Sequence, residues 1–443
     1  MTITNSLAKY IFKTSFCDLP SETVKRLAKI FVDQIGIGYM GYRKTGVELG
    51  DYAFRFSGSP EAIIIGSNRK VSCAIAAGVN AQLARNTNFE DSGPGLHPGP
   101  LIVHTALAAA QMANVSGKEI LTAMAIGYEL NYRFFKASKK AADIGYNNLI
   151  AAAISAKLFR FNLHQISKAI SLCWEFPVKR INYSKPKLTG RISALGMGHF
   201  FSANSGVQSS LMTLDGFISL EDELDYLEDE YDFDCLLNSD YQFKCLEKSV
   251  FLKFWPASHA SHMVLEATEE LIMENKITSN DIISVKVGLP DIYLLPHQNN
   301  SRPKDYWEAI YSFAWSMAMV IHRIPPGPQW FEGEVLANTD YTLTTDKISV
   351  EPNTEATKSF QRLDLSNITG WVILETTKGI LSCERCLAKT AGSPLIPLDE
   401  KKFISKFRTV LKGSKSVNET KNLYEVLSNI SKVTKINDIV SLL

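Results

Sequence analysis

The spacing of apolar residues predicts long helices over the first part of the chain. Between residues 20 and 43, Val24, Leu27 and Phe31 recur every three to four residues, which is the period of one buried helix face. Ser21 is the candidate N-cap of this helix. The helical period continues in apolar segments rich in Ala, Gly and Ser, at 72–85, 101–115, 117–135, 147–161, 163–176 and 203–214. Small residues let helices approach closely, so we expect an all-helical domain up to residue 268.

Strand patterns begin only after the helical segment 262–276. Alternation of apolar and polar residues predicts strands at 281–290, 345–353 and 370–383, the last as a hairpin about Lys378-Gly379, and residues 305–323 have a helical period. This mixture predicts a smaller α+β domain over residues 269–400. The helical tail 401–443 is expected to pack back on the first domain, which then comprises residues 1–268 and 401–443.

Composition and charge exclude several classes of protein. The 443 residues are 45% hydrophobic and 21% charged, which is enough apolar material for a large core. With 47 basic and 46 acidic residues the net charge is +1, and no basic stripe alternates with aromatic residues, so we expect no nucleic-acid partner. The acidic run 221–234 is interpreted as a solvated helix face.

The lack of a recognisable signal peptide or membrane span, together with the number of cysteines, predicts a cytoplasmic protein without a membrane partner. The N-terminal segment lacks the apolar stretch of a signal peptide. The most apolar run is interrupted by Lys157 and Arg160 before the roughly 18 to 20 residues that span a bilayer. Seven cysteines, an odd number, are typical of reduced thiols. Cys383 and Cys386 form a C-x-x-C pair, but no second pair completes a zinc site.

The segment 86–100, NTNFEDSGPGLHPGP, places ionisable residues at a break between helices. It contains Glu90, Asp91 and His97 among glycines and prolines. Histidine has a near-neutral intrinsic pKa, which suits proton transfer, and loops often carry catalytic groups. His97 is therefore the candidate for proton transfer, with Asp91 supporting it; alternatively, His97 only caps the following helix. Asp91 and Glu90 could also bond to loop amides or bind substrate, and a structural role is the alternative for Asp91.

A second candidate segment is FLKFWPASHASH, residues 251–262. Lys253 is a candidate carboxylate anchor or proton donor; alternatively, it is a surface lysine whose stem covers Phe254. His262 either completes the site or satisfies a buried backbone group, and His259 has a weaker claim. These two histidines are spaced like metal ligands, but no acidic partner stands nearby, so we expect no metal.

The ordered set of motifs resembles the MmgE/PrpD family over residues 6–440. The loop with its HPG turn, the segment GKEILTAMAIGYELNYR, the segment FLKFWPASHASH, the helix YSFAWSMAMVI and the ending AGSPLIPLDEKKFISKF carry the resemblance. It implies a mainly helical fold with a smaller α+β lid domain, a site in the cleft between the two, and a homodimer. Family members dehydrate 2-methylcitrate, decarboxylate cis-aconitate or epimerise iminodisuccinate, and they need no organic cofactor.

The resemblance also implies the site residues. Catalytic roles fall to His97, Asp91 and Lys253. Substrate-binding roles fall to a second group: Asn88, Glu90, Ser92, His199, His262 and Trp315. Removing or adding a group beside an activated carbon requires cations to hold carboxylates, a base near the carbon-bound proton and fixed donors for the developing charge.

Four departures separate this chain from the family pattern. Asn88 replaces the first acid of the family's D-F-D-D loop, and no histidine precedes the helix that begins near residue 148. The family has a lysine near the position that Leu195 occupies in this chain. Lys185, Lys187 or Arg191 could substitute for that lysine only through a local shift of the chain. Trp315 replaces an aromatic hydroxyl. A site that loses cations could not pair every carboxylate of a tricarboxylate.

We therefore expect a divergent lyase or isomerase that acts on a small, less anionic metabolite by cofactor-independent proton transfer. The reaction class stays open between dehydration, decarboxylation, epimerisation and cyclisation. One alternative is an ordinary 2-methylcitrate dehydratase or cis-aconitate decarboxylase. The other is a catalytically silent scaffold that binds a partner.

Overall fold

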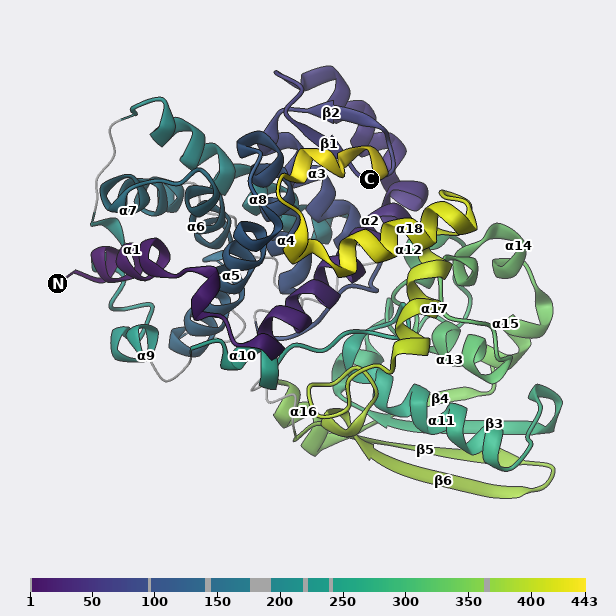
Figure 1. The fold of residues 1–443 in the computed structure, drawn as a ribbon. Helices are drawn as coiled ribbons and strands as arrows, with labels where there is room; N and C mark the ends of the chain where they lie inside the picture. Colours follow the sequence, from purple (N-terminus) through teal and green to yellow (C-terminus); the bar gives the residue numbers. More distant parts are fainter. Residues whose placement is uncertain are drawn as a thin grey trace.

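A body of helices is joined to a smaller part built on a four-stranded sheet, as Figure 1 shows. The structure is a computed structural model, which describes residues 2–94, 97–139, 145–175, 193–217, 222–238, 242–361 and 367–443. This architecture confirms the predicted fold class, mainly helical with a smaller α+β part.

The helical body follows the predicted apolar segments. Its helices are α1 (Ile3–Lys13), α2 (Ser21–Phe56), α3 (Cys73–Arg85), α4 (Pro98–Ala113), α5 (Gly117–Ala137), α6 (Asn147–Leu158), α7 (Leu163–Leu172), α8 (Ser193–Leu214), α9 (Phe233–Leu237) and α10 (Lys244–Lys248). Local caps fix several of these ends. For example, α5 begins with a capping box in which Ser116 and Glu119 each bond to the other's backbone N–H.

Small residues allow these helices to pack backbone against backbone, as predicted. A Cβ atom at Gly206 of α8 would overlap the carbonyl oxygen of Asn148 in α6. A Cβ atom at Gly41 of α2 would likewise overlap the carbonyl oxygen of Leu83 in α3. Glycine is therefore required at both contacts.

The local structure differs from the sequence expectations at three places. Helix α2 has Pro20 at its N-cap position and Ser21 as its first residue, so Ser21 is not the cap. A short hairpin of β1 (Ala62–Ile64) and β2 (Arg69–Val71) was not predicted. From residue 222 on, where the structure describes it, the acidic run forms a 3₁₀ turn at Glu223–Tyr226, further turns and the start of α9, not one continuous helix face.

The smaller part combines the sheet with short helices. The strands are β3 (Ile282–Leu289), β4 (Ile348–Pro352), β5 (Thr369–Thr376) and β6 (Gly379–Cys386), in the order β4-β3-β5-β6. Only the β3–β4 pair is parallel within this sheet, and β5 and β6 form the predicted hairpin. The helices are α11 (His262–Glu274), α12 (Tyr306–Ala309), α13 (Phe313–Ile321), α14 (Gly333–Leu336), α15 (Thr339–Thr345) and α16 (Thr354–Gln361).

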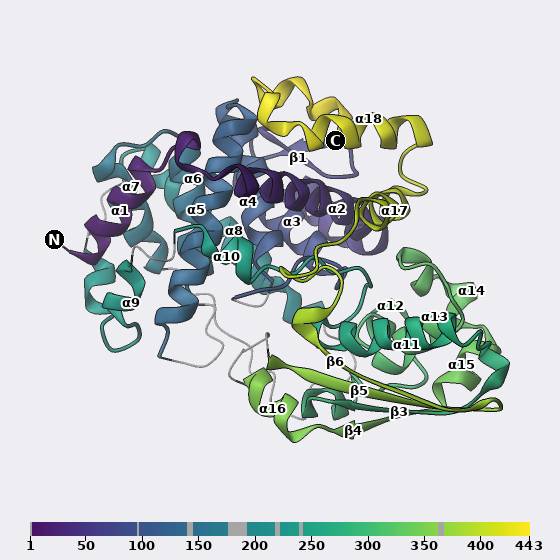
Figure 2. The same ribbon diagram turned by 60° about the horizontal axis from the view of Figure 1, so that its bottom comes forward.

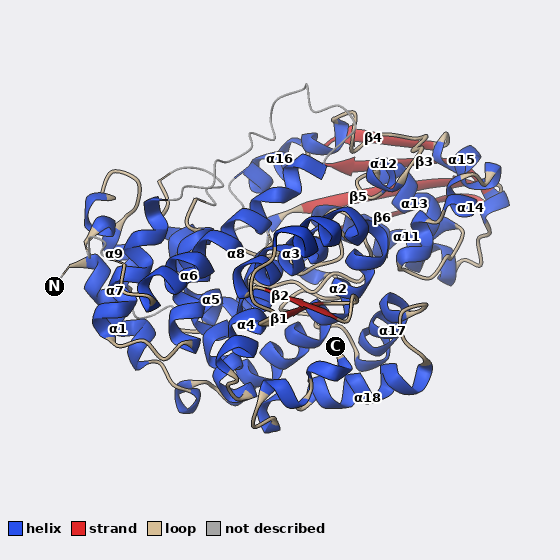
Figure 3. Ribbon diagram, turned by 90° about the horizontal axis from the view of Figure 1, so that it is seen from above, coloured by secondary structure: helices blue, strands red, loops and turns tan. Residues whose placement is uncertain are grey.

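Helix α11 covers the sheet on the side of the helical body. It contacts β5, β6 and α13, and Figures 2 and 3 show the sheet at one edge of the molecule with these helices beside it. Alternate residues of β5 are buried, which is the pattern of a strand with one covered face. The predicted helix 305–323 is interrupted between α12 and α13, where the Ser312 side chain accepts a hydrogen bond from Trp315 N and caps α13. This break leaves Ile310 and Tyr311 outside regular helix.

The C-terminal helices α17 (Glu400–Leu411) and α18 (Val417–Ser428) pack against α2 of the helical body. The predicted domain limit at residue 268 falls inside α11, and the exact limits of the domains stay a prediction.

None of the helices in the described parts of the chain is both long and apolar enough to cross a membrane.

Candidate active site

The loop between α3 and α4 lies where the helical body meets the sheet-containing part. Asn88 has a left-handed backbone with φ 48°, a conformation that asparagine adopts more readily than most residues. Its Nδ2 donates to the carbonyl oxygen of Ile310 at 2.8 Å, and the Tyr306 hydroxyl donates to the carbonyl oxygen of Asn86 at 2.8 Å. The interruption between α12 and α13 therefore supplies the surface on which this loop rests.

Glu90 is the centre of a buried cluster of charged side chains. Its Oε1 lies 3.1 Å from Arg85 Nη1, 2.8 Å from His97 Nδ1 and 3.6 Å from Lys253 Nζ. Glu90 and Lys253 are completely buried. The separation of the two atoms is that of a hydrogen bond, although the His97 N–H is not aligned on the oxygen as in a good one.

The charges of the cluster fix its protonation. Burial raises the pKa of Glu90, but Lys253, Arg85 and His97 together lower it well below its usual range, so the carboxyl is ionised. Burial and the positive charge of Arg85 lower the pKa of His97 to about 3, although Glu90 opposes this. His97 is therefore neutral at pH 7.

The neutral ring of His97 presents a basic nitrogen. The anionic Glu90 faces Nδ1 and favours the tautomer that carries its proton there. Nε2 then holds the lone pair, and no described residue forms a hydrogen bond with it. The His97 side chain is 18% exposed, so part of the ring is accessible to a ligand.

Lys253 is held in the cluster by Asn88. Its Nζ donates to the Asn88 carbonyl oxygen at 3.1 Å and to Asn88 Oδ1 at 2.9 Å. Burial lowers the pKa of Lys253 to about 8, opposed by Glu90, so the ammonium is charged at pH 7. The alternative of a surface lysine is wrong, because the side chain is inaccessible to solvent.

Asn88 uses both ends of its amide, one as acceptor from Lys253 and the other as donor to Ile310. An aspartate here could not donate to the Ile310 carbonyl. The amide therefore orients Lys253 and joins the two parts of the fold, which gives a structural reason for its replacement of the family acid.

Asp91 faces away from the cluster, toward the start of α4. Its Oδ1 accepts hydrogen bonds from Gly99 N at 2.8 Å and from Gln34 Nε2 at 3.2 Å, and its Oδ2 accepts from the Tyr128 hydroxyl at 2.7 Å. Burial raises its pKa to about 7. The support for His97 that was expected from Asp91 comes instead from Glu90.

Ser92 joins the loop to a second histidine. The Ser92 Oγ lies 2.8 Å from His259 Nδ1, and the Ser92 backbone pairs with Phe251 in both directions. Burial and the charge of Lys253 lower the pKa of His259 well below its usual value. Its Nε2 is buried without a hydrogen-bond partner among the described residues. His259 was the weaker candidate in the sequence, but through Ser92 it contacts the loop that carries Glu90.

The remaining predicted residues are more distant from this chemistry. His262 is buried between the rings of Phe251 and Trp255, at centroid distances of 5.5 and 5.3 Å. The His199 Nε2 donates to the carbonyl oxygen of His97 at 3.0 Å and so holds its backbone. Trp315 lies in the core of the sheet-containing part, where its indole N–H donates to a backbone oxygen at 2.9 Å.

Arg85 is a member of the cluster that the sequence analysis missed. It is buried, and its Nη1 also approaches the Tyr311 hydroxyl at 3.4 Å. The signal for it was present: Arg85 is the only charged residue of the segment 73–85, and it directly precedes the loop.

The proposed substitutes Lys185, Lys187 and Arg191 lie outside the described residues. Leu195 is in the first turn of α8, and only its backbone is described.

Metal ligands are not grouped in the described part of the chain, where no three His, Cys, Asp or Glu side chains come together to hold an ion. Cys383 and Cys386 are three residues apart on β6 and so point to opposite faces of the sheet. The expectation that no cofactor is needed stays a prediction.

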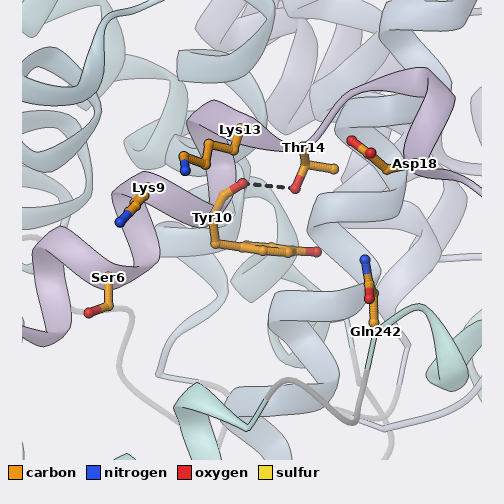
Figure 4. A pocket seen from close by; sticks show the side chains of 7 residues that line it. All are labelled: Ser6, Lys9, Tyr10, Lys13, Thr14, Asp18 and Gln242. Atoms are coloured by element: carbon orange, nitrogen blue, oxygen red, sulfur yellow. Dashed lines mark hydrogen bonds between the residues drawn. The ribbon is translucent and has the colours of Figure 1, made fainter.

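A separate groove of about 470 Å³ lies beside α1, as Figure 4 shows. It is open to solvent, and none of the predicted site residues lines it. The lining residues are Ser6, Lys9, Tyr10, Lys13, Thr14, Asp18 and Gln242.

Comparison with known proteins agrees with the motif order. Residues 5–245 match the model of the MmgE/PrpD N-terminal domain, and residues 255–431 match that of the MmgE/PrpD C-terminal domain. Cis-aconitate decarboxylase of Mus musculus is 24% identical over 343 residues, which cover 71% of this chain and 68% of that protein. Cis-aconitate decarboxylase of Homo sapiens is 22% identical over 360 residues, or 75% of this chain and 73% of that protein.

Proposed function

The chain belongs to the MmgE/PrpD family, and from this premise we propose that it is a lyase acting on a small carboxylate-bearing metabolite. One observation carries the proposal. A neutral histidine, His97, stands beside the ionised Glu90, and the cations Arg85 and Lys253 contact the same carboxylate oxygen. A base next to fixed positive charge is what carbanion chemistry requires.

In the proposed reaction, His97 Nε2 takes a proton from the carbon next to a carboxylate or carbonyl group. The carbon–hydrogen bond breaks, and its electron pair spreads onto the neighbouring oxygen. Arg85 is the described cation nearest to such an oxygen, and the buried Lys253 adds positive charge behind it without contacting the substrate. In a lyase the electron pair then forms a carbon–carbon double bond, and the group on the next carbon leaves with its own bonding pair. Return of the proton to the carbon would instead make the enzyme an isomerase.

The low pKa of His97 describes the site without a ligand. Burial and Arg85 keep it low. A carboxylate of the substrate that contacts Arg85 would neutralise this cation and add negative charge near the ring. Both effects raise the pKa of His97 toward the range in which it is an effective base.

The charges of the described cluster favour a substrate with fewer carboxylates than a tricarboxylate. Two cations, Arg85 and Lys253, stand against one carboxylate, Glu90, which leaves one net positive charge. Glu90 Oε2 is buried without a hydrogen-bond partner among the described residues, and so is His259 Nε2. Both atoms are closed to solvent, so a substrate hydroxyl or amino group would reach them only after the surrounding side chains move.

Product analysis tests this proposal. The purified protein is incubated with cis-aconitate, 2-methylcitrate and a panel of hydroxylated mono- and dicarboxylates, and products are followed by NMR. We expect turnover of a panel member at a higher kcat/KM than either tricarboxylate. His97→Gln should abolish this turnover, and His164→Gln, at an exposed histidine of α7, should not change it.

Turnover of cis-aconitate or 2-methylcitrate as the best substrate would instead identify an ordinary member of the family. Absence of turnover for every compound, with substrate binding also absent, would favour the alternative of a catalytically silent scaffold.

We also propose that the protein is a cytoplasmic homodimer without a cofactor, as the family resemblance implies. Light scattering on the purified protein measures the mass, and a value near that of one chain, 49.3 kDa, would contradict the dimer.

A further inference from the structure

A third buried cation lies behind the proposed site, on the C-terminal helix α17. Lys406 Nζ contacts three oxygen atoms: Asp33 Oδ1 at 2.7 Å, the carbonyl oxygen of Lys253 at 2.8 Å and that of Phe89 at 2.9 Å. Its side chain is 1% exposed. An ammonium group has three N–H donors, so these contacts use all of them.

The two carbonyl groups belong to the segments that carry the site. Phe89 lies between Asn88 and Glu90, and Lys253 is itself a member of the cluster. The segments are also joined by the backbone pair of Ser92 and Phe251. The contacts of Lys406 and of Ser92 therefore set the distance between the loop and the segment that bears Lys253.

Asp33 anchors this cation to the helical body. It lies on α2, and its side chain is 3% exposed. A buried ion pair contributes little to stability compared with apolar residues of the same size. Stability alone therefore does not explain why two charges are buried against the backbone of the site.

We propose that Lys406 and Asp33 are a positioning pair, which holds the loop of Glu90 and the segment of Lys253 at the separation that the reaction needs. The inference rests on the proposed function of the cluster. Neither residue touches the substrate: the pair acts through the backbone of Phe89 and Lys253.

Paired substitution tests the inference without leaving a buried charge. Lys406→Met alone would strand Asp33 and could unfold the protein, so the main variant is Lys406→Met/Asp33→Asn. Lys401→Met, at an exposed lysine of the same helix, is the control. The melting temperature is measured together with amide hydrogen exchange by mass spectrometry, for peptides over residues 86–94 and 249–258. A peptide over the distant β5–β6 hairpin, residues 369–386, is the internal reference.

We expect the double variant to stay folded with a lower melting temperature, because the carbonyl groups of Phe89 and Lys253 lose a donor. We expect it to exchange at least about tenfold faster in the two site peptides, with the reference peptide unchanged. In the same variant, kcat for the best substrate should fall by at least tenfold, while KM changes less, and Lys401→Met should resemble the wild type throughout.

Unchanged exchange in the site peptides of a stable double variant would overturn the positioning role. This readout does not need a substrate. Failure to find any reaction would thus count against the proposed function alone, while the exchange rates would still decide whether the pair holds the two segments together.

Discussion

Asn88 accepts hydrogen bonds from Lys253 through its backbone and side-chain oxygens. A charge introduced at Asn88 therefore acts directly on Lys253. Asn88→Asp would place a carboxylate where the amide oxygen now lies, 2.9 Å from Lys253 Nζ. We expect the pKa of Lys253 to rise from about 8 toward the ordinary value of lysine, because an opposite charge favours the ammonium form.

The measurement for Asn88 is a pH titration of ¹⁵N-labelled lysine side chains by NMR, with the Lys253 signal assigned through Lys253→Met. Asn68→Asp is the control, because Asn68 is exposed and has a similar left-handed backbone, with φ 54°. An unchanged titration midpoint in Asn88→Asp would show that the two side chains do not interact as described.

Asp91 differs from its neighbour Glu90 in that its contacts are structural. Asp91→Asn can no longer accept all three hydrogen bonds, from Gln34, Gly99 and Tyr128. We expect the free energy of unfolding to fall by about 1–3 kcal/mol. Turnover per folded molecule should stay within a few-fold of the wild type. Urea denaturation and steady-state kinetics check both, and lost turnover at unchanged stability would return Asp91 to a catalytic role.

The sequence could not distinguish the roles of these two acids. Glu90 and Asp91 are adjacent in one loop, and their side chains point to opposite sides because of the local backbone, including the left-handed Asn88. The positions of His97 and Lys253 followed from residue chemistry and motif order. The contact of Lys253 with Glu90 did not, because these residues are more than 150 positions apart and their contact depends on tertiary packing.

At the scale of elements, α6 and α8 approach each other most closely at a glycine of α8. A Cβ at Gly206 would overlap the Asn148 carbonyl oxygen, so we expect Gly206→Ala to lower the free energy of unfolding by about 1–3 kcal/mol. Gly198 lies on the same helix with no atom near the position of a Cβ. Gly198→Ala should be neutral or stabilise by up to about 1 kcal/mol, because alanine favours helix.

Thermal and urea denaturation compare the two alanine variants. Equal effects at the two positions would mean that helix propensity, and not backbone contact, decides the outcome. The helices themselves were predictable, because the apolar period persists over ten or more residues. The β1–β2 hairpin was not, since strands of three residues are too short to show alternation.

At the scale of the whole molecule, the site is assembled from segments that are distant in sequence: the α3–α4 loop, residues 251–259, residues 310–311 and α17. The ordered motifs predicted the family and the fold class. They did not predict that α17 contributes Lys406 to the back of the site, because no local pattern distinguishes this lysine from the others of an amphipathic helix.

The pH dependence of turnover reports on the assembled cluster. The charged form of Lys253 predominates below its pKa of about 8 and is lost as the pH rises through that value. We therefore expect kcat/KM to fall above pH 8. Lys253→Arg keeps its charge at higher pH, so any activity that it retains should persist above pH 9. A wild-type profile that stays flat to pH 10 would contradict the role of this cation.

Exchange of carbon-bound hydrogen with solvent tests the central claim most directly. The protein is incubated in D₂O with the carboxylates of the panel, and loss of substrate C–H signals is followed by proton NMR. We expect the wild type and the exposed-site control His164→Gln to catalyse exchange equally, and His97→Gln to be at least about 100-fold slower. Exchange at the wild-type rate in His97→Gln would contradict the assignment of His97 as the base.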